Sequence, residues 1–389
     1  MKTLSVPATF MRGGTSKGVF FNLEDLPEKA REPGPWRDLF LQRVMGSPDP
    51  YQKQIDGMGG ATSSTSKVVI ISPSKEPNHD VDYLFGQVSI DEGFIDWSGN
   101  CGNLSSAVGP FAIANGLIEE GNLDAEFSFV KIWQKNIKKT IVAKVPVERG
   151  QVKEIGEFEL DGVTFPAAEI ELRFKEPVDS ENEQLFPTGN LSDEFDIPGF
   201  GLTTATMINA GIPTIFLPAE ALNYKGTELQ EDINSKPAEL EKLEHIRARA
   251  SVAMGITSEI GESKKLQHIP KLAFLSAPQD YVSSSGKAIK AKDVNLLVRA
   301  MSMGKLHHAM MGTAAVAIGA AAAIPGTVVN KVTSIDSQEK SIVFGHPSGT
   351  LRVGADAAQT SGKWVIQEVS MSRSARVLMQ GSVRVHMND

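Results

Sequence analysis

The sequence predicts an α+β protein of two pseudo-symmetric domains, each a curved β-sheet folded around a central helix. Three observations lead to this prediction. The chain repeats one order of segments twice, each copy holds one helix that is apolar on all sides, and the rest of each copy is rich in strands. A helix that is apolar all round has to be covered on every side. A sheet curved around it is the simplest cover.

Each copy opens with a loop of small residues that runs into a short apolar strand. The first reads MRGGTSKGVFF over residues 11–21, and the second reads MINAGIPTIFL over residues 207–217. An amphipathic helix is predicted next, over residues 35–46 and again over 237–255, because apolar residues recur there at helical spacing. These apolar residues are Trp36, Phe40 and Val44 in the first copy and Leu240, Leu243 and Ile246 in the second.

A polar loop then enters a strand that has a lysine at its mouth. The segments are STSKVVIISP, residues 64–73, and HIPKLAFLSAP, residues 268–278, so Lys67 and Lys271 occupy matching places. Lysine is unusual there because an ammonium group loses hydration at the mouth of a buried strand. Lys67 could simply extend to the surface, but its place after a glycine-rich loop favours a functional role.

The apolar helices come next, and strand pairs close each copy. The helical segments are GNCGNLSSAVGPFAIANGLI from residue 99 and MMGTAAVAIGAAAAIPGTVV from residue 310. The turn over residues 135–138 matches the turn over 346–349. Five matches in the same order indicate a duplication.

The boundary between the copies is predicted in the polar stretch 180–199, which is rich in Pro, Gly and Asp. This gives domains over residues 1–188 and 189–389. A ligand site is expected between pseudo-symmetric halves, since domain interfaces supply deep clefts.

Composition excludes several classes of function. The net charge of −8 and the lack of a long basic run make a nucleic-acid surface unexpected. The single cysteine, Cys101, excludes an internal disulfide framework and fits a reducing cytoplasm. The N-terminal residues are too few and too polar for a signal peptide. The alanine-rich stretch near residue 320 is interrupted by Gly319 and Pro325, so it predicts a buried helix and no membrane span.

The starts of the two apolar helices are the expected anion site. Cys101-Gly102-Asn103 aligns with Met311-Gly312-Thr313, and a helix start offers free N–H groups and the positive end of the helix dipole. The sequence has no phosphate loop and no GxGxxG between a strand and a helix, so small carboxylates are favoured over nucleotides.

Metal and serine-nucleophile chemistry are not expected. The sequence has no HExxH, CxxC or GxSxG motif. His307 and His308, if helical, would point to different faces. His346 and Ser348 are two residues apart on a predicted turn, which is a poor arrangement for a nucleophile pair.

Cys101 has two interpretations. A lone cysteine is more often an inert core residue. At a helix N-terminus the thiol is also a plausible acid or base, and the duplicated context favours this role. Arg12, Lys17 and Lys271 are candidates for the positive charge that an acidic protein needs around an anionic substrate.

Five motifs together resemble one known family across essentially the whole chain. They are RGGTSKG, DGMGGATSSTSKVVI, SGNCGN, GHPSGTL and SRSARVLMQG. The chain resembles the 2-methylaconitate cis-trans isomerases, the PrpF proteins, which belong to the diaminopimelate epimerase fold group. The resemblance implies two domains that each wrap a mainly antiparallel sheet around a central helix, with the active site between them. It also implies that the last strand, VRVHM, can cross back to the first domain.

The chain departs from the epimerases at one site residue. The epimerases place a cysteine at both helix starts, whereas this chain keeps Cys101 at the first start and has Met311 at the matching position of the second, and methionine cannot exchange a proton. Racemisation by two thiols is therefore excluded. The resemblance implies that Lys67 is the base and that Cys101 lies in the pocket. The residues expected to bind substrate are Arg12, Ser16, Lys17, Ser64, Thr65, Ser66, Asn100, Gly102, Asn103, Lys271, Met311, Gly312, Thr313, His346, Ser348 and Gly349.

The implied reaction is an allylic proton shift on 2-methylaconitate or trans-aconitate, in the 2-methylcitrate cycle of propionate catabolism. It needs no metal, flavin or nucleotide. The implied partner is an aconitase-type methylcitrate dehydratase, and a homodimer is one expected assembly. Two alternatives stay open: a 4-oxalomesaconate-type keto–enol tautomerase, and a non-catalytic accessory protein that binds tricarboxylates. The protonation state of Lys67 also stays open, because substrate carboxylates raise its pKa while desolvation lowers it.

Overall fold

The computed structural model describes residues 2–119, 125–178, 184–197, 199–333 and 340–387. The chain divides into two units, residues 1–173 with 372–389 and residues 174–371. The chain leaves the first unit within β9 (Ile170–Lys175) and returns to it within β20 (Lys363–Arg373). The division precedes the predicted boundary at 188 because described residues 184–197 fold into the second unit. Within that stretch, the Leu185 carbonyl accepts a hydrogen bond from the Asn209 N–H at 2.8 Å.

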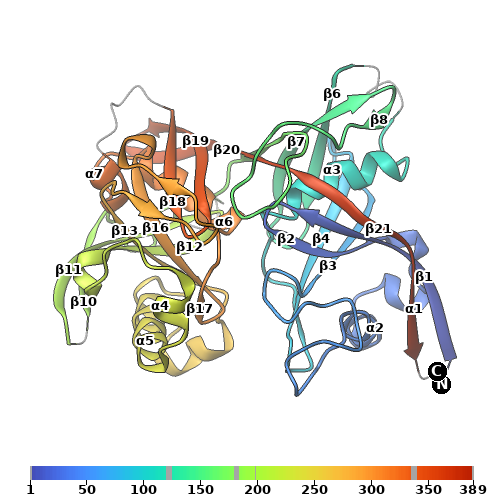
Figure 1. Ribbon diagram of the computed structural model, residues 1–389, viewed down its shortest axis with the longest axis horizontal. Helices are drawn as coiled ribbons and strands as arrows, with labels where there is room; N and C mark the ends of the chain where they lie inside the picture. The colour runs from blue at the N-terminus through green and yellow to red at the C-terminus, as the bar shows by residue number, and fades with distance from the viewer. Residues whose placement is uncertain (1, 120–124, 179–183, 198, 334–339, 388–389) are drawn as a thin grey trace. The chain divides into compact units, whose positions relative to one another are not determined.

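The two units repeat one series of strand neighbours (Figure 1). In the first unit the pairs β1–β2, β2–β3, β3–β4, β4–β6 and β6–β7 alternate between antiparallel and parallel. The second unit has the same alternation in β11–β12, β12–β13, β13–β16, β16–β18 and β18–β19. The strands of the first unit are β1 (Lys2–Gly13), β2 (Ser16–Asn22), β3 (Lys67–Pro73), β4 (Val81–Val88), β5 (Ile95–Asp96), β6 (Phe127–Gln134), β7 (Lys139–Glu148), β8 (Gln151–Val152) and β21 (Ala375–Met387). Those of the second are β10 (Asp193–Ile197), β11 (Gly201–Ala210), β12 (Ile212–Pro218), β13 (Lys271–Ser276), β14 (Tyr281–Val282), β15 (Ala288–Ile289), β16 (Leu296–Ser302), β17 (Lys305–Leu306), β18 (Ser341–His346) and β19 (Gly349–Thr360).

Each unit has a buried central helix, as the sequence predicts. Residues 105–113 of α3 (Ser105–Ala114) and every residue of α6 (Gly312–Ala322) are buried. Both helices carry a glycine where a strand passes closely. A Cβ on Gly109 would lie 2.7 Å from a Val145 methyl of β7, and one on Gly319 would lie 3.3 Å from a Val353 methyl of β19. The same close approach in both units supports the predicted duplication.

A second helix covers the other face of each sheet. These are α2 (Pro35–Met45) and α5 (Pro237–Ala253), at the predicted places. Phe40 and Val44 are buried in the first, Leu243 and Ile246 in the second, and the flanking Trp36 and Leu240 pack partly buried beside them. The shorter helices are α1 (Glu28–Arg31), α4 (Gln230–Asn234) and α7 (Val328–Thr333). Of the helices in the described part of the chain, none combines the length and the apolar character needed to cross a bilayer.

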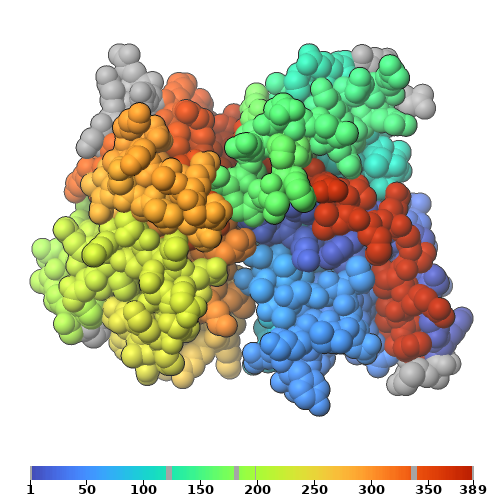
Figure 2. Space-filling model, in the orientation of Figure 1, coloured from blue at the N-terminus to red at the C-terminus, as the bar shows by residue number. Residues whose placement is uncertain are grey.

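The last strand returns to the first. β21 pairs antiparallel with β1 from Lys2 opposite Met387 to Gly13 opposite Ala375. Figure 2 shows this C-terminal segment in red beside the blue N-terminal strand. The resemblance gave this return for VRVHM, and the paired strand is longer than that segment.

Candidate active site

Lys67 is the first residue of β3 and is buried, with 7% of its surface exposed. Val68 and Ile70 of the same strand pack into the cluster under α2, so Lys67 starts from the opposite face, toward α3. The glycine of β2 beside it leaves the space that it occupies. A Cβ on Gly18 would lie 2.7 Å from the Lys67 carbonyl oxygen, 3.1 Å from its Cβ and 3.2 Å from a methyl of Leu104.

The Lys67 amino group contacts only uncharged groups among the described residues. Its Nζ donates a hydrogen bond to Gln87 Oε1, and Gln87 Nε2 donates to the Ser66 carbonyl at 2.9 Å. The Phe85 ring centroid lies 5.1 Å from Nζ. No carboxylate of the described chain forms an ion pair with this lysine.

Burial lowers the pKa of Lys67 below its ordinary value, and the smaller effect of Cys101 opposes this. A lower pKa makes a neutral amine more accessible near neutral pH.

Cys101 precedes the turn that leads into α3, whose N-cap is Leu104. Its carbonyl accepts the Ser105 N–H at 3.0 Å, and its Sγ accepts the Leu104 N–H at 3.5 Å. The Tyr83 hydroxyl donates to the same carbonyl at 3.3 Å, and burial raises the pKa of this hydroxyl, with Cys101 adding to the effect. The matching Met311 carbonyl accepts the Ala315 N–H at 2.9 Å, so both residues stand at a helix start.

Arg373 is a buried cation that the sequence argument did not select. It is 1% exposed, and its Nε donates to Asn103 Oδ1 at 2.9 Å. Asn103 Nδ2 in turn donates to Thr15 Oγ1 at 3.1 Å. Burial lowers the pKa of Arg373 to about 10, opposed by Cys101. The available signal was the arginine between two serines in SRSARVLMQG, just before the strand that returns to the first domain.

The glycine loop RGGTSKG packs against this cluster. Gly14 has a φ of +52°, and a Cβ on it would lie 2.5 Å from Asn103 Oδ1. Arg12 Nη1 donates to the carbonyl oxygens of Gly14 and Ser374, at 3.0 and 2.8 Å. Burial lowers the pKa of Arg12 to about 10, with Arg376 adding to the effect. The loop is therefore fixed to the segment around Arg373.

The other predicted residues of the first unit divide between the loop, the turn before β3 and the other sheet face. Lys17 starts from the α2 face, and its Nζ lies 5.4 Å from the Phe10 ring centroid. Ser66 Oγ donates to Gln54 Oε1 at 2.8 Å, and Thr65 bonds Thr62. Ser16, at the start of β2, and Gly102 are buried. The Ser64 carbonyl accepts the Lys17 N–H at 3.0 Å. The buried Oδ1 of Asn100 has no partner among the described residues.

In the second unit the turn after β18 bonds the segment before α6. Ser348 Oγ donates to the His308 carbonyl at 2.5 Å, and the Ser348 N–H donates to His346 Nδ1 at 3.2 Å. A Cβ on Gly211 would lie 3.1 Å from the Thr313 carbonyl, the counterpart of the contact between Gly13 and the Asn103 carbonyl. This brings His346, Ser348 and Gly349 near the residues that lead into Met311, Gly312 and Thr313.

The interpretation of His307 and His308 as helical is wrong. They follow β17 in an irregular segment, and their rings stack with centroids 4.6 Å apart. In a helix the two side chains would point to different faces, whereas the irregular backbone here lets the two rings stack on each other. Among the described residues, no cluster of three or more His, Cys, Asp or Glu is placed to hold a metal ion.

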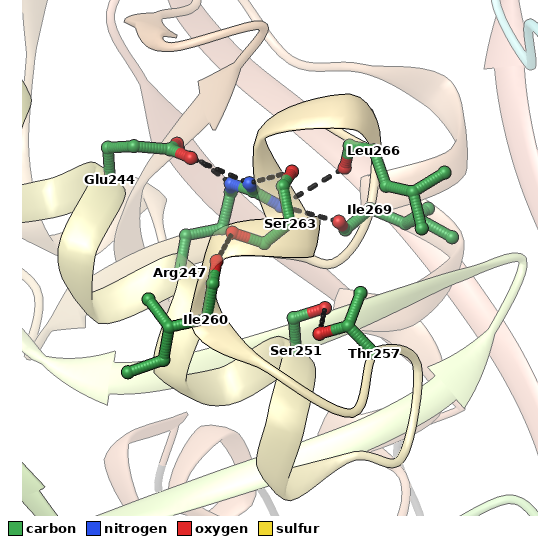
Figure 3. A network of polar contacts seen from close by, with 8 residues as sticks. All are labelled: Glu244, Arg247, Ser251, Thr257, Ile260, Ser263, Leu266 and Ile269. Carbon is green, nitrogen blue, oxygen red and sulfur yellow. Dashed lines mark hydrogen bonds and ion pairs between the residues drawn. The ribbon is translucent and has the colours of Figure 1, made fainter.

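Lys271 begins β13, as Lys67 begins β3, and is 6% exposed. The segment that leads into it is held by Arg247 of α5 (Figure 3). Arg247 forms a bidentate pair with Glu244, at 2.8 and 2.7 Å, and donates to the carbonyls of Ser263, Leu266 and Ile269. A buried arginine thus fixes the chain just before the matching lysine.

Solved structures establish the fold. A crystal structure of methylitaconate-delta-isomerase is 37% identical, has a TM-score of 0.80, and the match covers 99% of this chain and 96% of that one. A hydroxyproline epimerase from Agrobacterium vitis is 11% identical with a TM-score of 0.52, over 99% of this chain and 93% of that one, and shows the fold alone. The protein is an isomerase of diaminopimelate epimerase-like fold.

Sequence comparisons give the family. A family model described as PrpF protein matches residues 3–386. A 2-methyl-aconitate isomerase of Shewanella oneidensis is 63% identical over 98% of this chain and 97% of its own length. A protein of the same name from Cupriavidus necator is 60% identical over the same shares. The chain belongs to the PrpF family, and the resemblance found in its motifs is confirmed.

Proposed function

We propose that the protein isomerises 2-methylaconitate by moving one proton and one double bond. The observation that carries this proposal is Lys67, a buried lysine beside Cys101 whose described partners are all uncharged. The two relatives at 60 and 63% identity carry the name of this activity. Those names favour it over the tautomerase and over the non-catalytic accessory protein.

Lys67 in its neutral form removes a proton from the CH₂ group next to a substrate carboxylate. The electron pair of the C–H bond moves into an extended enolate, and the lysine becomes an ammonium ion. The double bond then shifts or rotates, and the lysine returns the proton to a different carbon. One base performs both transfers, which agrees with a methionine at the position that matches Cys101 in the second copy. Cys101, whose charge acts on Lys67, is the second proton-exchanging group of the proposed site.

Donors near the helix start stabilise the enolate in this proposal. The N–H groups of Leu104 and Ser105 already bond Cys101, so they are not the expected donors. The backbone N–H of Gly102, before the positive end of α3, is the proposed donor.

Buried arginines are the proposed partners of the substrate carboxylates. Arg12 and Arg373 form no ion pair with a carboxylate of the described residues, although both are buried or partly buried. A buried cation without a counter-charge is costly, and a tricarboxylate supplies that charge.

The other predicted substrate-binding residues of both units, with Lys271 as a further cation, belong to the same proposal. We place the reaction in the 2-methylcitrate cycle of propionate catabolism, in the cytoplasm, where the single cysteine is suited to a reducing environment. An aconitase-type methylcitrate dehydratase would supply or consume the substrate, and a homodimer is the proposed assembly.

Proton exchange tests the proposal directly. The protein is incubated with 2-methylaconitate, and separately with trans-aconitate, in D₂O, and the substrate is followed by NMR. We expect deuterium to enter the methylene or methyl positions while the other isomer forms. Lys67→Ala should abolish both effects.

The matched control is Lys75→Ala, which removes an exposed lysine just beyond the far end of β3. It should exchange and isomerise like the wild type. Substrate resonances that shift without exchange would indicate a binding protein and contradict the proposal. Faster turnover of 4-oxalomesaconate than of 2-methylaconitate would favour the tautomerase.

A further inference from the structure

Gln87 lies directly across the sheet from Lys67. The antiparallel register of β3 and β4 pairs these two residues. The Gln87 amide bonds at both ends: Oε1 accepts from Lys67 Nζ, and Nε2 donates to the Ser66 carbonyl at 2.9 Å. Because the NH₂ end is held by a backbone carbonyl, the oxygen end faces the amine.

The chemistry of this partner suits a base. An amide oxygen accepts a hydrogen bond from an amine but carries no formal charge. A carboxylate at the same place would stabilise the ammonium form and keep the lysine protonated. The other close group, the Phe85 ring 5.1 Å away, is also uncharged. Gln87 therefore orients the Lys67 amine, and neither Gln87 nor Phe85 stabilises the ammonium form as strongly as a carboxylate would.

The second unit differs from the first in its register. The antiparallel pairing of β13 and β16 ends at Ala273 opposite Ala300, two residues before it would reach Lys271. In the first unit the pairing of β3 and β4 includes Lys67 itself, opposite Gln87. The register therefore places an amide opposite the lysine in the copy that also carries Cys101.

We propose that Gln87 is a positioning residue for the proton transfer, an uncharged acceptor that fixes the direction of the Lys67 amino group. This inference rests on the proposed function, in which Lys67 is the base. One N–H of the neutral amine is used by Gln87, so its lone pair points elsewhere and is available to a substrate C–H group. The titratable group that acts on the Lys67 amine is Cys101 before α3, and Cys101 in turn acts on Tyr83 of β4 and on Arg373, which is bonded to Asn103.

Two substitutions separate direction from charge. Gln87→Glu keeps the shape and adds a negative charge, so the rising limb of kcat/KM against pH should move about 1 to 3 pH units upward. Below that limb kcat/KM should fall about 10-fold for each unit of the shift. Gln87→Met adds no charge and loses the acceptor, so kcat should fall about 10- to 100-fold with little change in KM and no upward shift of the limb.

Gln151→Glu is the charge control, because it adds the same charge to an exposed residue of β8 in the same unit. Its pH profile should match that of the wild type. Thermal unfolding of each variant verifies that it folds, and Gln87→Met still tests the direction if the glutamate variant does not fold. A Gln87→Glu limb that coincides with the wild-type limb, or Gln87→Met at full kcat, overturns this inference alone. Failure of Lys67→Ala to abolish exchange would overturn the proposed function instead.

Discussion

Replacing Gly18 with alanine is expected to slow the reaction by displacing Lys67. The added Cβ would lie 2.7 Å from the Lys67 carbonyl oxygen. This distance is 0.7 Å shorter than 3.4 Å, the shortest ordinary van der Waals contact of a Cβ atom. It would also lie 3.1 Å from the Lys67 Cβ. A backbone oxygen in a paired strand cannot turn aside, so the start of β3 has to move by several tenths of an ångström.

The size of the effect follows from that displacement. A misplacement of 1 Å costs about 100-fold in rate, so a shift of about half that size should lower kcat about 10-fold. Overpacking should also cost about 1 to 3 kcal/mol of unfolding free energy. Initial rates of 2-methylaconitate isomerisation, with urea unfolding of the same samples, measure both quantities.

Gly381→Ala is the matched control for this substitution. Gly381 lies on β21 in the same unit, and a Cβ on it would meet no atom within 4 Å. That variant should keep the wild-type kcat and be equally or slightly more stable, since alanine restricts the unfolded chain. If Gly18→Ala isomerises substrate as fast as Gly381→Ala, the close packing of the glycine loop does not position Lys67.

Three further substitutions test burial and charge. Lys67→Met should raise the free energy of unfolding at neutral pH, because burial lowers the pKa of this lysine in the folded protein and the unfolded chain holds the proton more tightly. The gain in stability should be greatest below the folded pKa and should vanish as the pH rises to the ordinary pKa of 10.5. Urea unfolding at several pH values measures this dependence. Arg373→Met removes a buried cation and the donor to Asn103 Oδ1. The KM for the tricarboxylate should therefore rise about 10- to 100-fold in steady-state assays. An unchanged KM would show that Arg373 does not bind the substrate. Arg247→Met breaks the pair with Glu244 and three bonds to backbone carbonyls, and should cost about 2 to 4 kcal/mol in urea unfolding; a loss under 1 kcal/mol would contradict the network in Figure 3.

Local patterns allowed much of the fold to be predicted. The central helices are recognisable because they are apolar on every side, and the outer helices because Phe40 and Val44, or Leu243 and Ile246, recur at helical spacing. The position of Lys67 follows from the strand that it begins. These features depend on neighbours a few residues away, which the sequence displays directly.

Contacts that depend on which residues of two strands pair, or on the chain coming back to the first unit, could not be predicted from local patterns. Gln87 meets Lys67 only because β3 and β4 pair in one register. Arg373 meets Asn103 across 270 residues of sequence. Composition also marks residues 180–199 as a linker, whereas Thr188 and Asn190 bond Asp193 and Thr206 bonds the Leu191 carbonyl within the second unit.

The duplicated scaffold and the unequal chemistry of its two copies together favour catalysis by a single base. Both copies keep a lysine at the start of the matching strand and a buried central helix that begins with small residues. The first copy has a thiol at Cys101, where the second has Met311, and its register places the Gln87 amide opposite the lysine. Racemisation by two thiols would require a cysteine at both helix starts, and the second start carries Met311, which cannot exchange a proton. A proton that leaves one carbon and returns to another on the same substrate can be carried by one amine, and this chain places the uncharged Gln87 acceptor beside the Lys67 amine.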